Sequence, residues 1–267
     1  MSRVVVITGA ARGLGEGMAR KLSARGARVA LLDRDIEPLE AVVKACPGSR
    51  GWAVDVTNAA ALAKVAEEVA QHFGRVDALV VNAGIGDGGV FRYQDVDAFE
   101  RVIEVNLLGS IRTTRAFLPH VIASKGYVLQ IASLAAFLPA PMMTAYCASK
   151  AGVEAFAHCL RSEVRHHGVD VGVAYLAFTD TDMVRRVDND PVLAGMRSHL
   201  PWPFAASRPV GPAVARLVRG IEGRKAHVYT PRWLRIMPAV RGLLPSLVAK
   251  GAPSTAEAEE LTLLHMQ

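Results

Sequence analysis

The chain of 267 residues has little cysteine, with only Cys46, Cys147 and Cys159. The number is odd and the spacing matches no metal site, so the sequence argues against a disulfide framework and against a cysteine-based metal centre. We therefore expect reduced thiols, a cytoplasmic location and no bound metal.

Long hydrophobic runs are also missing. No window reaches the roughly 18 apolar residues that a membrane-spanning helix needs. The first apolar run, residues 4–7, is too short for the core of a signal peptide. Apolar residues make up 51% of the chain and charged residues 21%, which is typical of a globular protein with a substantial core. We expect one domain over residues 1–250 and a loose tail over residues 251–267.

Acidic residues are scarce in one stretch. Residues 197–250 contain ten Lys or Arg residues and a single acid, Glu222. Such a surface can attract nucleic acid or anionic lipid, but a solvated basic face explains the same pattern, and we expect no nucleic-acid partner. Residues 231–250 mix aromatic, aliphatic and arginine side chains, as interfacial helices do. We favour packing on the domain or on a second subunit, with peripheral membrane contact as the alternative.

Apolar runs rich in β-branched residues alternate with helical patterns along the chain. The expected strands cover residues 4–7, 28–32, 52–56, 76–81, 127–132, 169–176 and 227–230. The expected helices cover residues 13–25, 37–45, 60–73, 99–121 and 145–167. Buried strands that alternate with helices indicate βαβ units. The sequence therefore predicts an α/β fold of three layers, with a doubly wound parallel sheet of about seven strands between helices on both faces.

A glycine-rich turn joins the first expected strand to the first expected helix, in the segment Thr8-Gly9-Ala10-Ala11-Arg12-Gly13-Leu14-Gly15. Gly9 allows a tight turn, Gly13 lets the backbone approach a pyrophosphate, and Gly15 lets the helix pack closely on the strand. The free N–H groups at the helix start, around Leu14, can then bind phosphate. The position of this turn predicts a dinucleotide site.

Asp33 ends the second expected strand, at the place where an acid hydrogen-bonds a ribose 2′-hydroxyl. A carboxylate there repels a 2′-phosphate, which favours NAD over NADP. Arg12 and Arg34 favour the opposite choice, since either can pair with a 2′-phosphate. We expect NAD, with NADP as the alternative cofactor. An ordinary helix N-cap is the alternative interpretation of Asp33.

Further residues stand in a recognisable order along residues 3–183. They are Thr8-Gly9-x-x-x-Gly13-x-Gly15, Asp55-Val56, Asn82-Ala83-Gly84, Asn106, Ser133 and Tyr146-x-x-x-Lys150. In this order and spacing they resemble the short-chain dehydrogenase/reductase family, in its single-domain type. The resemblance implies a Rossmann-like fold, a nicotinamide cofactor, oxidoreductase activity, and a homodimer or homotetramer.

The resemblance also implies roles at the cofactor for matching residues. Asp55 and Val56 would contact the adenine. Asn82, Ala83 and Gly84 would line the floor under the adenosine ribose and steady the sheet.

The chain departs from the family pattern after the sixth expected strand. The family usually has Pro-Gly there, whereas this chain has Leu176-Ala177, and Thr179 stands where Val or Ile is usual. Thr181 is kept and would reach the nicotinamide carboxamide or the phosphates. Thr179 and Thr181 are therefore expected at the cofactor, in a backbone that differs locally from that of the family.

The resemblance places Asn106, Ser133, Tyr146 and Lys150 in a catalytic tetrad. Tyr146 and Lys150 lie four residues apart, hence on one face of their helix. A nearby ammonium lowers the pKa of a tyrosine from about 10, so we expect Tyr146 to act as general acid and base while Lys150 also binds the nicotinamide ribose. Ser133 would hold the substrate oxygen. Asn106 would kink its helix and order a water that relays protons.

These residues together predict an NAD(P)-dependent oxidoreductase that interconverts a secondary alcohol and a ketone, with the hydride supplied by the cofactor. Residues 182–207 lie where the family has its substrate lid, and their Met, Trp, Phe and Leu content favours an apolar alcohol or ketone. Two alternatives stay open. One is a nucleotide-binding regulator without turnover, and the other is a dehydratase or epimerase on the same scaffold.

Overall fold

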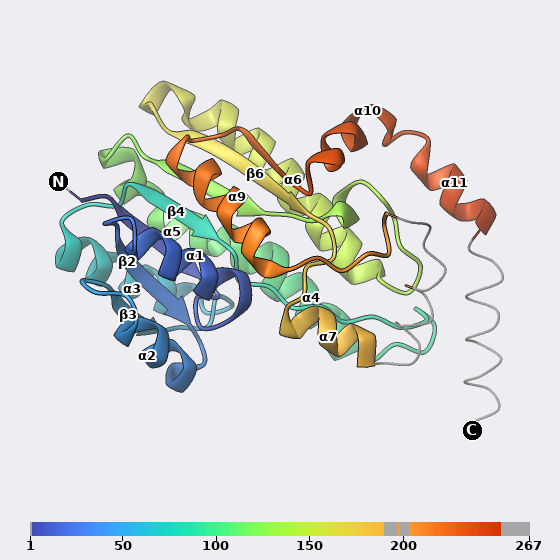
Figure 1. The fold of residues 1–267 in the computed structure, drawn as a ribbon, viewed down its shortest axis with the longest axis horizontal. Helices are drawn as coiled ribbons and strands as arrows, with labels where there is room; N and C mark the ends of the chain where they lie inside the picture. Colours follow the sequence, from blue (N-terminus) through green and yellow to red (C-terminus); the bar gives the residue numbers. More distant parts are fainter. Residues whose placement is uncertain (1, 190–196, 198–202, 252–267) are drawn as a thin grey trace.

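The structure is a computed structural model that describes residues 2–189, 197 and 203–251. In the described part of the chain, seven strands form one parallel sheet in the order β3-β2-β1-β4-β5-β6-β7 (Figure 1). The strands are β1 Val4–Thr8, β2 Arg28–Asp33, β3 Arg50–Ala53, β4 Ala78–Val81, β5 Tyr127–Ile131, β6 Asp170–Leu176 and β7 His227–Thr230. The predicted α/β fold with a doubly wound parallel sheet is confirmed.

Helices cover both faces of this sheet (Figure 1). One face is covered by α1 Gly13–Ser23, α2 Ile36–Lys44 and α9 Val210–Glu222, and the other by α3 Ala59–Phe73, α5 Gly109–Ala123 and α6 Thr144–Val164. Further helical segments are α4 Val96–Ile103, η1 Glu104–Leu108, η2 Leu134–Ala136, η3 Arg165–His167, α7 Asp182–Asn189, η4 Arg232–Ile236, α10 Met237–Val240 and α11 Leu244–Gly251.

Alternate side chains of each strand enter two separate cores, because successive residues of a strand point to opposite faces. Val4 and Val6 of β1 pack with α3, α5 and α6. Val5 and Ile7 pack with α1, α2 and α9. The sheet is therefore buried on both faces, and folds of this kind bind their ligands at the carboxyl ends of the strands.

Most elements lie within two or three residues of their predicted bounds, and two differences bear on the fold and the site. The third strand, Arg50–Ala53, begins earlier than expected. The long helix expected over residues 99–121 consists of α4, the π-helical turn η1 and α5. Asn106 lies inside η1, so the irregularity expected at this residue takes the form of a π-helical turn, a feature that often occurs at functional sites.

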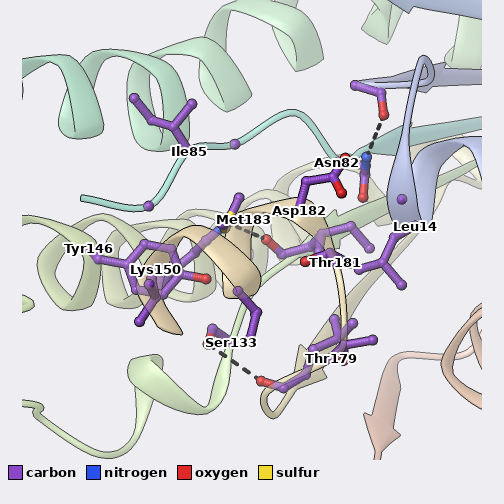
Figure 2. Close-up of a pocket in the computed structure, with 18 of the residues that line it drawn as sticks. Leu14, Asn82, Ile85, Ser133, Tyr146, Lys150, Thr179, Thr181, Asp182 and Met183 are labelled. Carbon is purple, nitrogen blue, oxygen red and sulfur yellow. Dashed lines mark hydrogen bonds between the residues drawn. The ribbon is translucent and has the colours of Figure 1, made fainter. Parts of the chain in front are cut away.

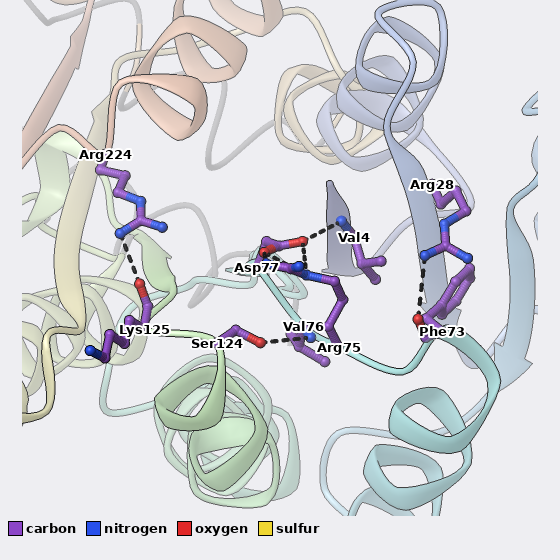
Figure 3. A network of polar contacts seen from close by, with 9 residues as sticks. All are labelled: Val4, Arg28, Phe73, Arg75, Val76, Asp77, Ser124, Lys125 and Arg224. Carbon is purple, nitrogen blue, oxygen red and sulfur yellow. Dashed lines mark hydrogen bonds and ion pairs between the residues drawn. The ribbon is translucent and has the colours of Figure 1, made fainter. Parts of the chain in front are cut away.

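Arginines stabilise the edge of the sheet where the strands begin (Figure 3). Asp77, just before β4, accepts hydrogen bonds from the Val4 N–H at 2.8 Å and from Arg75 Nε at 3.0 Å. Arg224 Nη1 donates to the carbonyl oxygen of Lys125 at 2.8 Å. Part of the basic charge of the chain is therefore used for contacts inside the fold.

The apolar and basic segment over residues 231–250 packs on the domain. It forms η4, α10 and α11 (Figure 1). Its buried side joins the core beside α6 through Leu234, Met237 and Leu244. Arg241 donates a hydrogen bond to Glu154 of α6 at 3.0 Å. The contact with the domain that the sequence favoured is present.

No helix among the described residues is long and apolar enough to cross a membrane. The same part of the chain contains no group of three or more His, Cys, Asp or Glu side chains that could hold a metal ion. Much of the expected lid, residues 190–196 and 198–202, and the expected tail over residues 252–267 lie outside the described residues.

Candidate active site

The carboxyl ends of β1 and β4 are joined by side-chain hydrogen bonds. The hydroxyl oxygen of Thr8 accepts from the backbone N–H of Asn82 at 3.0 Å and of Ala83 at 3.1 Å. Asn82 Nδ2 donates to the carbonyl oxygens of Thr8 at 3.0 Å and Gly9 at 3.1 Å. The chain order reverses between β1 and β4, and such switch points are where doubly wound sheets bind nucleotides.

Glycines of the first turn are required by close contacts. Gly9 has a φ of 64°, and a Cβ there would lie 2.9 Å from the Cα of Ala83. A Cβ on Gly15 would lie 1.9 Å from the carbonyl oxygen of Gly9. Gly13 has a φ of 56° and faces Thr181, whose Cγ2 would be 3.4 Å from an added Cβ. The helix α1 begins at Gly13 without a side-chain cap, so its first N–H groups remain available to phosphate.

Asp33 at the end of β2 carries a carboxylate in a fixed orientation. Its Oδ2 accepts from the Ala11 N–H at 3.0 Å and its Oδ1 from the Asp35 N–H at 3.1 Å. Asp35, rather than Asp33, is the N-cap residue of α2, so the alternative interpretation of Asp33 as a helix cap is wrong. Each carboxylate oxygen retains a lone pair that can accept from a ribose hydroxyl.

Arg12 and Arg34 are both paired with the same acid. Arg12 Nη2 lies 2.9 Å from Asp35 Oδ2, and Arg34 Nε lies 3.7 Å from Asp35 Oδ1. Asp35 thus partly neutralises the two side chains that could bind a 2′-phosphate.

Ser133, Tyr146 and Lys150 meet at the carboxyl end of β5 (Figure 2). Ser133 follows β5, its hydroxyl donates to the carbonyl oxygen of Leu176 at 3.4 Å, and it interacts with the Tyr146 side chain so as to lower the tyrosine pKa. Its Oγ also accepts from the Ala135 N–H at 3.2 Å. Lys150, 5% exposed, donates to the carbonyl oxygen of Ile131 at 3.0 Å, and its Nζ lies 5.7 Å from the centre of the Tyr146 ring. The predicted catalytic hydroxyls and amine therefore share one small region.

Burial changes the pKa values of this pair. Burial raises the pKa of Tyr146, although the hydrogen bond with Ser133 lowers it. Burial lowers the pKa of Lys150 to about 8. The prediction that the pKa of Tyr146 is lowered is therefore wrong for the protein without its cofactor. Removal from water disfavours the tyrosinate and the ammonium alike, and burial is the largest cause of the pKa shift at both residues.

Asn106 is fully buried and uses its amide to hold neighbouring backbone. Its Oδ1 accepts from the Ile85 N–H at 2.8 Å, and its Nδ2 donates to the Ile85 carbonyl at 2.9 Å and to Ser149 Oγ at 3.1 Å. A Cβ on Gly84 would lie 3.1 Å from Asn106 Oδ1 and 3.5 Å from Lys150 Nζ. Asn106 therefore fixes the loop after β4 beside Lys150, and the proton relay through water stays a prediction.

A cavity of about 360 Å³ connects the glycine turn with the tyrosine. Its polar end contains Gly9, Arg12, Gly13, Leu14, Asp33, Arg34, Asn82, Ala83 and Gly84. Ser133, Tyr146, Lys150, Thr179 and Thr181 line its middle. Its other side chains are mainly apolar and include Ile85, Leu134, Leu138, Met143, Met183 and Val187. The volume is within the range of small-molecule sites.

Four predicted site residues do not line this cavity. Gly15 and Asn106 act behind it through the packing described above. Asp55 accepts from Thr57 and from Arg101, and Val56 is 8% exposed in the core. Burial raises the pKa of Asp55, but the hydrogen bonds from Thr57 and the Arg101 charge outweigh it and the net shift is downward. The adenine contacts expected of Asp55 and Val56 stay predictions.

The replacement of Pro-Gly by Leu176-Ala177 has a simple local consequence. Leu176 continues β6 and pairs with Thr230 of β7, and the Ala177 N–H donates to the Thr230 carbonyl at 3.1 Å. Ala177 takes no positive φ, so a glycine is not needed there. Thr179 is buried and its hydroxyl donates to the Ala177 carbonyl at 3.0 Å.

Some cavity residues were not identified individually from the sequence. Asp35 follows Asp33 closely, but its pairing with two arginines depends on how the turn folds. Ile85 is placed by the buried amide of Asn106. Met183 and Val187 are apolar residues of the expected lid, and the structure places both of them at the cavity.

Comparison with known proteins identifies the family of the chain. Residues 3–191 match the family model described as short chain dehydrogenase. The chain is 38% identical over 191 residues to a bovine (Bos taurus) protein named dehydrogenase/reductase SDR family member 7B, covering 67% of this chain and 59% of that protein. It is 30% identical over 252 residues to 11-beta-hydroxysteroid dehydrogenase-like 2 of Arabidopsis thaliana, covering 92% and 79%.

A solved structure supports the fold. The crystal structure of gox2181 superimposes with a TM-score of 0.77 at 23% identity, over 85% of this chain and 94% of that one. The match to the bovine relative spans about three fifths of that protein's length. The family model, the Arabidopsis relative and the geometry of the site agree, and the chain belongs to the short-chain dehydrogenase/reductase family of oxidoreductases.

Proposed function

We propose that the protein interconverts an apolar secondary alcohol and a ketone with NAD(H), and that Tyr146 transfers the proton. The observation that carries the proposal is the shared cavity. It brings the Ser133 and Tyr146 hydroxyls and the Lys150 amine next to a turn suited to dinucleotide phosphates.

The residues present fit a dinucleotide. In the turn from Gly9 to Gly13, glycine stands at both positions with a positive φ, so no side chain crowds the backbone there. The N–H groups at the start of α1, beside this turn, have no side-chain cap. Asp33 would accept from the adenosine ribose hydroxyls. The pairing of Asp35 with Arg12 supports NAD over NADP, because it competes with a 2′-phosphate for the guanidinium. Lys150 and Thr181 would hold the nicotinamide end, where the bound cofactor supplies or accepts a hydride.

The proton chemistry belongs to the chain's own residues. The raised pKa keeps Tyr146 protonated at neutral pH, which suits a proton donor to the carbonyl oxygen of a ketone. Ser133 would hold the same oxygen through its hydroxyl. The protonated form of Lys150 would stabilise the tyrosinate that remains. In the oxidation direction the tyrosinate would take the proton from the alcohol.

The apolar part of the cavity supports a hydrophobic substrate. Met143 and Val187 pack together with Met142 and against Tyr146. Such side chains contribute affinity through the area they remove from water and offer few partners for a polyol. The name of the Arabidopsis relative, 11-beta-hydroxysteroid dehydrogenase-like 2, supports the same substrate class.

A panel of substrates tests this proposal. Apolar cyclic and steroid ketones are compared with small polar ketones, using NADH and NADPH and following their absorbance. We expect turnover with the apolar ketones and a higher kcat/KM with NADH. A clear preference for small polar ketones or polyols, or turnover without consumption of the cofactor, would contradict the proposal.

A further inference from the structure

A buried carboxylate lies on the helix that carries Tyr146 and Lys150. Glu154 is four residues after Lys150 in α6 and is 4% exposed. Its Oε1 accepts from the Tyr175 hydroxyl of β6 at 2.8 Å, and its Oε2 accepts from Arg241 Nη2 at 3.0 Å. His158 Nε2 lies 3.8 Å from Oε1, with a side chain that is 41% exposed. The carboxylate therefore joins three parts of the chain.

Arg241, which follows α10, makes a second set of contacts. Its Nη2 lies 3.4 Å from the carbonyl oxygen of Ala136 in η2, and its guanidinium carbon lies 5.4 Å from the centre of the Phe137 ring. Phe137 packs on Tyr175, with ring centres 4.5 Å apart. The short helix η2 directly follows Ser133. Arg241 thus contacts η2, the segment next to Ser133, and through Glu154 it contacts α6, the helix that carries Tyr146.

A buried carboxylate is tolerated only when charge and hydrogen bonds compensate for the loss of water. The planar guanidinium can donate to a carboxylate and a carbonyl while stacking on a ring, which a lysine cannot do in one geometry. Each of the three elements that Arg241 and Glu154 connect contains or adjoins a residue that lines the cavity. The helix η2 follows Ser133, α6 contains Tyr146, and β6 precedes Ala177.

We propose that Arg241 is a positioning residue, which sets the place of Ser133 relative to Tyr146 by linking η2 to α6 through Glu154. The proposal rests on the proposed function, because it concerns the same reaction. It assigns a role in the site to the segment over residues 231–250, none of which lines the cavity.

The test compares three variants by turnover per cofactor-binding site, which corrects for any unfolded fraction. Arg241→Met keeps the length and apolar packing of the side chain but loses both of its hydrogen bonds. It should lower kcat by roughly tenfold or more, because small displacements of reacting groups are costly, while the Kd for NADH stays within about twofold of wild type. Arg241→Lys keeps the charge and should recover part of kcat. Arg235→Ala, an exposed arginine of the same segment, should change nothing.

The outcomes separate the two proposals. A wild-type kcat in Arg241→Met, or equal losses of kcat and NADH affinity that Arg241→Lys does not recover, would overturn the positioning role. If Arg241→Met fails to fold, a kcat of Arg241→Lys equal to that of wild type overturns it. A wild-type protein that binds NADH but turns over no ketone would instead overturn the proposed function, and the positioning role with it.

Discussion

The two ends of the cavity are built differently. The cofactor end is held by hydrogen bonds between neighbouring loops, as at Asn82, and by glycines such as Gly9 where an added Cβ would crowd the backbone. The substrate end is formed by apolar side chains such as Met183 and Val187, and is braced from outside by the Arg241–Glu154 pair. The cofactor end therefore depends on local backbone geometry, and the substrate end on packing between distant segments.

The largest effect should come from the amine between the two ends. Burial lowers the pKa of Lys150 to about 8, so its ammonium is present below that pH and is lost above it. We expect kcat for ketone reduction to fall as the pH rises through this value, because the tyrosinate left on Tyr146 loses its counter-charge. Lys150→Met should lower kcat by roughly 10²- to 10⁴-fold.

Steady-state rates across pH, with pH jumps to control for stability, provide the measurement. The decline should be absent from the residual activity of Lys150→Met. A wild-type profile that is flat through this range would show that Lys150 does not support the tyrosinate.

The next effect tests the rigid cofactor end. Gly15→Ala places a Cβ 1.9 Å from the Gly9 carbonyl oxygen, and we expect about 1–3 kcal/mol of destabilisation from the forced shift, together with weaker NADH binding. Gly211→Ala is the matched control, because nothing lies within 4 Å of a Cβ there. Denaturant unfolding and NADH titration measure both. Equal stability of the two variants would mean that the glycine turn is more plastic than its contacts indicate.

The smallest effect concerns cofactor choice at the outer edge of the same end. Asp35→Asn should release Arg12 and Arg34 and raise the affinity for NADPH relative to NADH a few-fold, in line with the roughly 0.2–1 kcal/mol of an exposed ion pair. Asp170→Asn, which removes a similar partner from Arg224 at the opposite edge of the sheet, serves as control. An unchanged ratio of the two Kd values would show that Asp35 has no influence on this choice.

The contrast between the two ends also explains what the sequence could predict. The glycine turn, Asp33 and the Tyr146–Lys150 pair are local patterns whose spacing translates directly into strand ends and helix faces. The parallel sheet followed from alternating apolar runs for the same reason. The π-helical turn at Asn106 was indicated only as an irregularity, since a single mid-helix asparagine does not specify the type of turn.

Other features depend on contacts that sequence order does not reveal. Arg241 and Glu154 are far apart in the chain, and nothing in the pattern of either segment indicates that they meet. The direction of the pKa shift at Tyr146 was predicted wrongly because the charge of Lys150 was visible in the sequence while the burial of both groups was not. The contacts of Leu176 and Ala177 with β7 likewise required the completed sheet.

The most direct test of the account is the removal of one oxygen atom at Tyr146. In Tyr146→Phe, NADH binding measured by fluorescence titration and ketone reduction measured by absorbance are compared with wild type, using the best ketone of the panel. The account predicts that kcat falls by at least roughly 10²-fold while the Kd for NADH stays within a few-fold of wild type. A variant that binds NADH and retains a wild-type kcat would contradict the assignment of the proton transfer to Tyr146.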